Sequence, residues 1–217
     1  MQAYTVINGK DIASLALVTR EPQALGPHDV RVRINAVSLN FRDLMVARGD
    51  YLQGASSPVI PASDAAGEVI EVGKAVTRFA PGDRVMGSFF PDWIDGDATP
   101  ATTRVAPGAA TDGVLSTERV FAETALAATP PSLSDEQAST LPCAAVTAWN
   151  ALFVAGGAKA GHTALFLGTG GVSVWGLQLA KAAGLRAIIT SSSASKLERA
   201  RAMGADGLIN YLSLIHI

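Results

Sequence analysis

Alternating apolar and polar residues predict β-strands in the first part of the chain. In residues 30–36 (VRVRINA), aliphatic residues alternate with arginine and asparagine, which is the period of a half-buried strand. Residues 67–73 (GEVIEVG) repeat this alternation between two glycines, and strand character returns at residues 119–122 (RVFA). A tight turn at residues 81–83 (PGD) leads into a further strand. Residues 92–113 are rich in Gly, Pro, Ala, Thr and Asp and predict a long surface loop.

The pattern changes near residue 128, where we place a domain boundary. Ser134 followed by two acids is typical of a helix start, and residues 144–155 form a second helical run that two glycines end. From residue 163 onward, apolar runs of strand length alternate with amphipathic runs of helix length, which indicates a parallel sheet. The fold class predicted is therefore α/β: a β-rich domain over residues 1–128, then a doubly wound parallel sheet over residues 129–211.

A glycine-rich loop lies where the first strand of this α/β domain ends. Residues 163–167 (TALFL) predict a strand buried on both faces, and Gly168, Gly170 and Gly171 follow it directly, ahead of a helix. Glycines at such a turn let the backbone approach a pyrophosphate, which then faces free N–H groups at the helix N-terminus. Ser173 stands at the usual third glycine position, which predicts slightly wider spacing of helix and strand. The loop predicts a dinucleotide site; the alternative is a tight turn in another doubly wound fold.

The end of the next strand bears on which dinucleotide is bound. An NAD site usually has an acid there, bonded to the ribose 2′-hydroxyl, whereas residues 190–193 read TSSS. Hydroxyl groups can donate hydrogen bonds to a 2′-phosphate, and Lys196 can neutralise its charge. The segment therefore favours NADPH. The alternative is that the serines form a polar turn and that Lys196 is merely solvated.

Composition and charge narrow the class of protein. Of 217 residues, 48% are hydrophobic and 17% are charged, with a net charge of −2 and no basic run, which argues against nucleic-acid and membrane partners. We expect no apolar stretch long enough to span a bilayer, no secretory signal, and a cytoplasmic location. The single cysteine, Cys143, excludes an internal disulfide framework and a four-cysteine zinc site.

Five motifs in order along the chain carry a resemblance to a known family. They are VSLNFRD at residues 37–43, PASDAAG at 61–67, PGDRV at 81–85, LPCAAVTAW at 141–149, and the glycine loop with QLA at 178–180. In these motifs the chain resembles a medium-chain dehydrogenase/reductase of the zinc-free quinone oxidoreductase-like (zinc-type alcohol dehydrogenase-like) branch. The resemblance implies a GroES-like barrel as catalytic domain, then a Rossmann domain, with the active site in the cleft between them.

The resemblance also bears on metal binding. Zinc-dependent members hold the catalytic metal at positions that match Asn40, Ser63, Asp64 and Cys143 here. Asn40 and Ser63 are poor zinc ligands, so we predict no metal site and no zinc. We interpret Cys143 as a buried small hydrophobic residue. A catalytic thiol would need a histidine partner, and none of the three histidines (His28, His162 and His216) lies in a motif.

By the same resemblance, individual residues receive roles. Asn40 matches the asparagine beside the nicotinamide and substrate, and Asp43, Tyr51 and Thr147 match positions that line this region. We predict Asn40, Asp43 and Tyr51 as catalytic. The predicted cofactor-binding residues are Thr147, Gly168, Gly170, Gly171, Val172, Ser191, Lys196 and Tyr211, of which the last three match the residues that hold the 2′-phosphate. Alternatives are a turn-capping amide for Asn40 and a half-buried ring for Tyr51.

The chemistry implied is hydride transfer from NADPH to a quinone, enone or related carbonyl substrate. Without a metal, hydroxyl or amide donors must meet the developing negative charge, and Asn40 and Tyr51 are the groups we expect to do so. Two alternatives stay open: an alcohol dehydrogenase-like NAD(P)-dependent enzyme, and a non-catalytic NADPH-binding protein such as the lens crystallins of this branch.

The end of the chain departs from the family pattern. The family's Rossmann domain continues with three more strands, whereas this chain stops after its third. Residues 212–217 (LSLIHI) resemble the translation of a transposon-end adapter, and we interpret them as a non-native tail on a truncated sequence. We therefore expect the 217-residue chain alone to be poorly soluble or partly unfolded and inactive. For the full-length protein the resemblance implies a homodimer.

Overall fold

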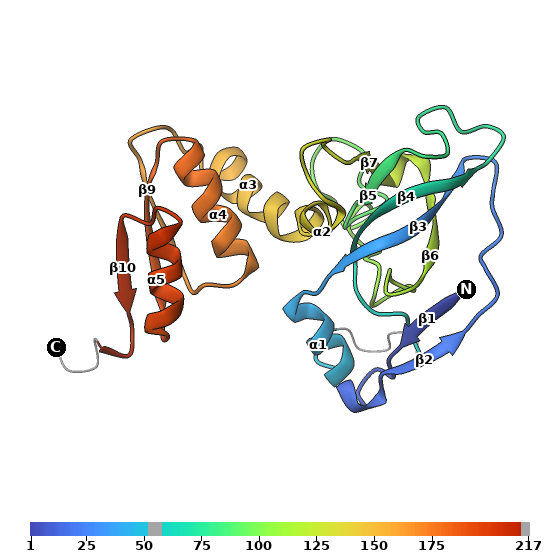
Figure 1. Cartoon of the computed structure of the whole chain (residues 1–217), viewed down its shortest axis with the longest axis horizontal. Coiled ribbons are helices and arrows are strands. Elements are labelled where there is room, and N and C mark those ends of the chain that lie inside the picture. Colours follow the sequence, from blue (N-terminus) through green and yellow to red (C-terminus); the bar gives the residue numbers. More distant parts are fainter. Residues whose placement is uncertain (52–57, 214–217) are drawn as a thin grey trace. The chain divides into compact units, whose positions relative to one another are not determined.

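The computed structural model describes residues 1–51 and 58–213. Two compact units make up the chain, Met1–Pro142 and Cys143–Ile217, and each is described by itself (Figure 1). The division lies at Pro142, whereas the change in sequence pattern lies near residue 128, because the segment between them includes a short helix that packs on the first unit. That helix is α2 (Asp135–Ala138), and its first residue accepts hydrogen bonds from Asn35 at 2.8 Å and from Arg84 at 2.6 Å.

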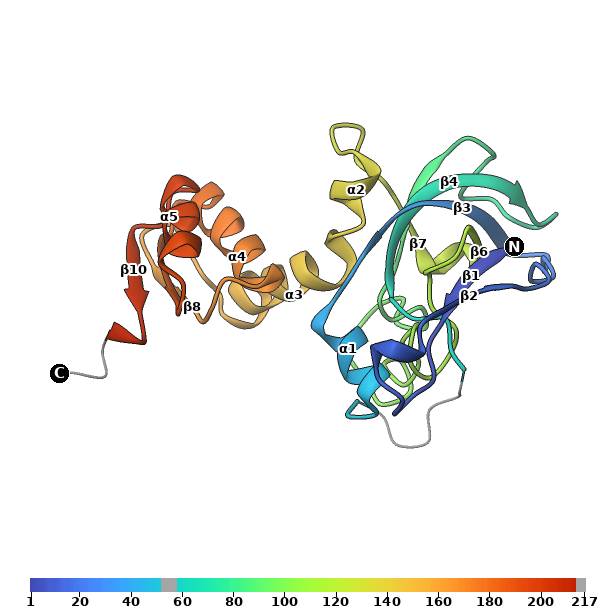
Figure 2. The same cartoon turned by 60° about the horizontal axis from the view of Figure 1, so that its bottom comes forward.

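The first unit is built on a five-stranded antiparallel sheet, in the order β6-β3-β4-β5-β7, that curls into a half-barrel (Figures 1 and 2). Its strands are β3 (Asp29–Ser38), β4 (Asp64–Val72), β5 (Arg84–Gly87), β6 (Glu118–Ala122) and β7 (Leu126–Ala128). A separate antiparallel pair consists of β1 (Gln2–Thr5) and β2 (Ala16–Thr19). Two 3₁₀ turns, η1 (Ile12–Ser14) and η2 (Glu123–Ala125), connect elements. The predicted β-rich N-terminal domain is confirmed.

The apolar positions of the strand pattern form the core of this sheet. Val30 and Val32 of β3 are 0% and 2% exposed, and they cluster with Val69, Val85 and Leu126 from three neighbouring strands. The intervening arginines point away from this core, where Arg31 pairs with Glu71 at 2.8 Å. Period-two alternation therefore correctly identified which face of β3 is buried.

Residues 92–113 form the predicted loop, with only a single isolated bridge between Pro107 and Thr111. Its second half is not a surface loop, however, because Ala106 and Ala109 are buried. Two glycines allow this burial: Gly108 has φ +81°, and at Gly113 a Cβ would lie 2.0 Å from the carbonyl oxygen of Ala62. The backbones of the two segments thus approach more closely than any side chain would permit.

The second unit contains a three-stranded parallel sheet in the order β10-β9-β8 with helices between successive strands. The elements are β8 (Thr163–Phe166), α4 (Gly171–Ala182), β9 (Arg186–Ser191), α5 (Ala194–Ala202) and β10 (Gly207–Asn210), preceded by α3 (Val146–Trp149) between the π-helical turns η3 (Leu141–Ala145) and η4 (Asn150–Ala155). Strands alternating with crossover helices are one half of a doubly wound sheet, as predicted.

One expectation for this unit is wrong. The run of residues 163–167 predicted a strand buried on both faces, yet Leu165 and Leu167 are 57% and 77% exposed. The reason is that the two faces of β8 differ: Ala164 and Phe166 pack on the core of the unit, whereas Thr163 and Leu165 point to the opposite face and are exposed. The buried strand is the central β9, where Ala187 and Ile189 are fully buried with Leu177 and Ala180 of α4.

The helical segments from Asp135 to Ala155 run for 21 residues and are long and apolar enough to meet the criterion for a membrane span, contrary to the sequence expectation. One such helix is weak support for a membrane protein, because core helices pass the same test by length and composition. Of the proposed tail, Leu212 and Ser213 are described and residues 214–217 lie outside the described residues.

Candidate functional site

Two of the predicted catalytic residues, Asn40 and Asp43, lie at the start of helix α1 (Phe41–Arg48), which the sequence pattern did not predict. Asn40 has an extended backbone at the N-cap, and its N–H donates to Oδ2 of Asp43 at 2.8 Å. This Asn-x-x-Asp spacing is a capping signal that could have located the helix. Val46 and Ala47 hold its buried face against Val59.

Two polar atoms at this helix start are buried without a hydrogen-bond partner in the described chain. They are Nδ2 of Asn40 and Oδ1 of Asp43. Buried polar groups are almost always paired, and exceptions are frequent where a ligand is bound. Burial raises the pKa of the Asp43 carboxyl, whereas the hydrogen bond from Asn40 and the charge of Arg42 act in the opposite direction. The amide of Asn40 therefore has free capacity to donate to a ligand.

The raised pKa of Asp43 predicts a pH effect on stability. The folded chain holds a proton that the unfolded chain has released, so this carboxyl stabilises the fold fully below its unfolded pKa of about 4, and the contribution is lost as pH rises through the raised folded pKa. In Asp43→Asn, Oδ1 of the amide can still accept from Asn40. We expect the difference in melting temperature between Asp43→Asn and wild type to shift in favour of the variant from pH 4 to pH 7, by on the order of 2 to 4 °C.

Thermal melts at both pH values check this, with Asp92→Asn, an exposed aspartate of the same unit, as control. A difference between Asp43→Asn and wild type that stays constant from pH 4 to pH 7 would show that the carboxyl is not perturbed in the folded chain.

Tyr51 follows the C-terminal end of α1, with 37% of the residue exposed. Its ring centroid is 5.1 Å from the guanidinium carbon of Arg42, and the ring of Phe89 is 4.8 Å from the same carbon. Sequence reasoning singled out neither Arg42 nor Phe89. For Arg42 a signal was available: it is an arginine between Asn40 and Asp43, in a helix that otherwise packs against apolar residues.

Two of the positions that match zinc ligands, Ser63 and Asp64, bond to each other in the first unit. Ser63 and Asp64 are 1% and 0% exposed, and the Ser63 hydroxyl donates to Oδ1 of Asp64 at 2.6 Å, so a carboxylate is already engaged by a neutral donor. Within the described residues, no group of three or more His, Cys, Asp and Glu side chains could hold a metal ion. Cys143, predicted to be buried, is only partly so, because it begins the second unit in the π-helical turn η3.

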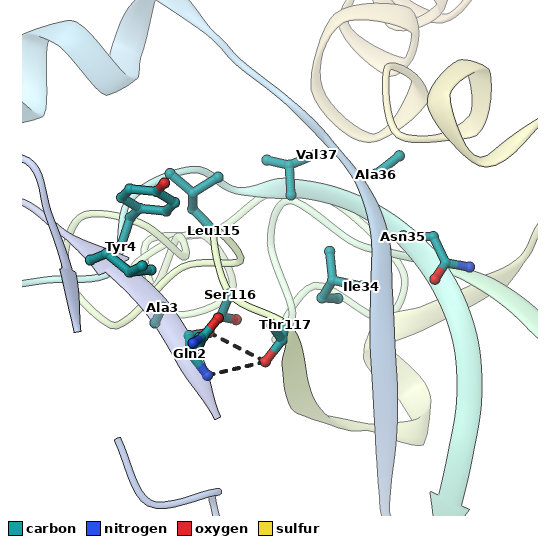
Figure 3. A pocket seen from close by; sticks show the side chains of 11 residues that line it. Gln2, Ala3, Tyr4, Ile34, Asn35, Ala36, Val37, Leu115, Ser116 and Thr117 are labelled. Carbon is teal, nitrogen blue, oxygen red and sulfur yellow. Dashed lines mark hydrogen bonds between the residues drawn. The ribbon is translucent and has the colours of Figure 1, made fainter. Parts of the chain in front are cut away.

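A cavity of about 330 Å³ lies elsewhere in the first unit, between β1, β3 and residues 115–117 (Figure 3). Apolar side chains such as Ile34 and Leu115 line it together with Gln2, whose backbone N–H donates to Oγ1 of Thr117 at 3.2 Å. None of the residues predicted as catalytic lines this cavity. The cavity is therefore separate from the candidate site at α1.

In the second unit, the glycine loop has the geometry that the sequence predicted. Gly168 has φ +81°, which favours glycine, and its N–H donates to Oγ1 of Thr190 on the adjacent strand at 3.0 Å. Gly170 is the N-cap of α4 and Gly171 its first residue. A Cβ at Gly168 or Gly170 would meet nothing within 4 Å, so open space lies beside the backbone at the helix start. Val172 follows on the first turn, 42% exposed.

The close approach of helix and strand depends on a glycine that sequence reasoning missed. At Gly176, a Cβ would lie 2.3 Å from the ring of Phe166 in β8. Ser173, at the usual third glycine position, instead turns its hydroxyl to the carbonyl oxygen of Leu167 at 3.1 Å. This glycine in the second turn of α4 thus allows the tight packing of α4 on β8.

The three predicted 2′-phosphate residues lie near the carboxyl ends of adjacent strands. Ser191 ends β9 and is 4% exposed; its hydroxyl accepts from the N–H of Ser193 at 3.2 Å, and its carbonyl oxygen accepts from the N–H of Tyr211 at 3.3 Å. Lys196 is exposed on the first turn of α5, where its N–H donates to the hydroxyl of Ser193 at 3.4 Å. The structure therefore brings Ser191 and Tyr211 together and places Lys196 one helical turn away.

Thr147 lies on α3, which packs against α4. A Cβ at Gly171 would be 3.5 Å from the Cβ of Ala144, so the start of this helical segment lies beside the glycine loop. The predicted cofactor-binding residues of the second unit are thus distributed over α3, the loop, and the ends of β9 and β10.

Comparison with known proteins gives consistent results. Residues 26–131 match the alcohol dehydrogenase GroES-like domain. The chain is 46% identical, over 88% of its length and 56% of the relative's, to a zinc-type alcohol dehydrogenase-like protein of Schizosaccharomyces pombe. A crystal structure of a putative alcohol dehydrogenase from Sinorhizobium meliloti superposes with a TM-score of 0.87 at 46% identity, covering 98% of this chain and 64% of that one.

The crystal structure of Escherichia coli quinone oxidoreductase complexed with NADPH superposes with a TM-score of 0.81 at 25% identity, over 98% of this chain and 59% of that one. The chain thus spans little more than half the length of the curated relative and under two thirds of the solved structures. Residues 26–131 therefore belong to the alcohol dehydrogenase GroES-like domain family, and the chain as a whole is similar to members of the medium-chain dehydrogenase/reductase superfamily.

Proposed function

We propose that the protein is a zinc-independent reductase that uses NADPH to reduce a quinone, an enone or a related carbonyl compound. The observation that carries this proposal is the end of β9, where a buried serine, Ser191, stands beside Tyr211 in place of an acid. A carboxylate at a strand end binds the ribose diol of NAD and repels a 2′-phosphate, whereas hydroxyl groups and a lysine favour the phosphate. The relative solved with NADPH supports the same choice.

The donor set of the first unit supports zinc independence. Zinc prefers thiolate, imidazole and carboxylate, and an amide and a hydroxyl at Asn40 and Ser63 are poor replacements. The hydroxyl of Ser63 is moreover committed to Asp64. The side chains present do not fit zinc, although the Schizosaccharomyces pombe relative is named as zinc-type.

The residues of this chain supply binding and hydrogen bonding. NADPH, when bound, supplies a hydride from nicotinamide C4. The glycine loop faces the pyrophosphate with the N–H groups at the start of α4. Asn40, whose amide nitrogen is buried without a partner among the described residues, donates to the substrate oxygen on which negative charge develops, and the hydroxyl of Tyr51 is the second donor.

A substrate panel tests the proposal. We expect the purified protein, in the longest form that its gene encodes, to oxidise NADPH at least about tenfold more efficiently than NADH when quinones and enones are supplied. Simple alcohols with NADP are expected to react far more slowly, because they normally depend on a metal to acidify the hydroxyl group. Stoichiometric zinc together with loss of activity on chelation would favour the alcohol dehydrogenase-like alternative, and NADPH binding without turnover would favour the non-catalytic one.

Three further expectations stay predictions. They are the homodimer of the full-length protein, the cytoplasmic location, and the inactivity of the 217-residue chain alone. Sedimentation and activity measurements on the 217-residue chain and on any longer product of the gene decide the first and the third.

A further inference from the structure

Arg42 is a buried cation that forms no ion pair among the described residues, although its charge acts on the neighbouring carboxyl of Asp43. It is the second residue of α1 and is 8% exposed. One guanidinium nitrogen, Nη2, donates to the carbonyl oxygen of Pro107. Within the described chain, Arg42 forms no ion pair, and its Nε and Nη1 are buried without an acceptor. Such a group costs several kcal/mol to bury unless something compensates it.

The surroundings of the guanidinium provide aromatic faces in place of a counter-charge. The ring centroids of Tyr51 and Phe89 lie 5.1 Å and 4.8 Å from its central carbon, within the range of cation–π attraction. The start of α1 adds the positive end of a helix dipole, which disfavours a cation there. An aliphatic side chain of similar volume would fill the same space without these costs, so packing alone does not explain an arginine.

We propose that Arg42 is a positioning residue: its fixed charge holds the ring of Tyr51 in place and keeps a positive potential where negative charge develops on the substrate. The proposal rests on the proposed function, in which the hydroxyl of Tyr51 meets the substrate. In a site whose side chains do not fit zinc, the charge of Arg42 supplies the positive potential. Arg42 itself acts through Tyr51, because the contact that the structure shows is between its guanidinium and the ring of Tyr51.

Kinetics separate the charge of Arg42 from its shape. In Arg42→Ala, we expect kcat to fall about 3- to 30-fold, the range of a desolvated cation–π contact, with the KM for NADPH unchanged. Millimolar guanidinium is expected to restore most of the loss, whereas urea, a neutral molecule of the same planar shape, and sodium chloride of equal ionic strength are not. Arg42→Lys, which keeps the charge, is expected to retain more activity than Arg42→Met. Equal rescue by urea, or full activity in Arg42→Met, would overturn the proposal.

A second readout does not depend on the reaction and so separates this proposal from the proposed function. The chain has three tyrosines, Tyr4, Tyr51 and Tyr211, so that fluorotyrosine labelling gives a simple ¹⁹F NMR spectrum in which Tyr51→Phe assigns one signal. We expect the Tyr51 signal to move in Arg42→Ala and to return with guanidinium but not with urea, while those of Tyr4 and Tyr211 stay in place. If the Tyr51 signal does not move in Arg42→Ala, the positioning role is wrong even if the protein reduces quinones. If the signal moves and guanidinium restores it, the role is supported even if no quinone is reduced.

Discussion

Replacing Lys196 by glutamate is expected to weaken NADPH binding by on the order of 100-fold while leaving NADH binding within about threefold of wild type. The lysine is exposed on the first turn of α5, one turn from the strand end that carries Ser191. A 2′-phosphate held there carries up to two negative charges, so reversing one cation replaces attraction by repulsion at short range. NADH lacks this phosphate and loses nothing comparable.

Isothermal titration with both dinucleotides measures this effect directly and requires no turnover. Lys159→Glu is the matched control, because it makes the same charge change at another exposed lysine of the second unit. Ser191→Ala adds a second point: the loss of one hydrogen bond to a charged group predicts roughly a tenfold weaker Kd for NADPH. An equal loss of NADPH and NADH affinity in Lys196→Glu would mean that the lysine does not read the 2′-phosphate.

Replacing Gly67 by alanine is expected to remove on the order of 3 kcal/mol from the free energy of unfolding of the first unit, a large part of the 5 to 15 kcal/mol typical of a domain. Gly67 lies in β4 opposite Ile34 of β3, where the register of the pair shifts. A Cβ there would lie 1.9 Å from the carbonyl oxygen of Arg33 and 2.9 Å from its carbonyl carbon. Both atoms belong to the backbone of a central strand, so relief requires moving that strand.

Urea denaturation followed by circular dichroism checks this, with Gly170→Ala as the matched control. That substitution adds the same methyl group where nothing lies within 4 Å and where φ is −80°. We expect the control to change the unfolding free energy by less than about 1 kcal/mol. Equal unfolding midpoints for Gly67→Ala and wild type would contradict the prediction. They would show that the backbone of β3 can move away at its register shift without loss of stability.

Local patterns were sufficient for most of the fold. The alternation in residues 30–36 gave β3 and its buried face, and the run from Gly168 to Ser173 gave the turn between β8 and α4. The sequence pattern did not predict helix α1 because its eight residues carry only a short apolar face. Helices of that length depend on tertiary contacts such as those of Val46.

The sequence could not locate contacts between distant segments. Arg42, Phe89 and Pro107 meet although 65 residues separate the first from the last. Gly176 could not be singled out, because only the packing of α4 on β8 shows that Phe166 occupies the space of a side chain there. The exposure of Leu165 likewise follows from the face of β8 on which it lies, opposite the core of the unit, and not from the composition of the strand.

The residues that pack the core of the second unit are largely separate from those expected to contact the 2′-phosphate, and this separation has an evolutionary consequence. Ala187 and Ile189 carry the packing of the second unit, whereas two of the groups that are expected to distinguish the dinucleotides, Lys196 and Tyr211, lie outside the strands and are exposed to solvent. A lineage can therefore change Lys196 without disturbing any buried contact. Dinucleotide preference should accordingly be among the most evolvable properties of this scaffold, drifting between close relatives while the core stays constant.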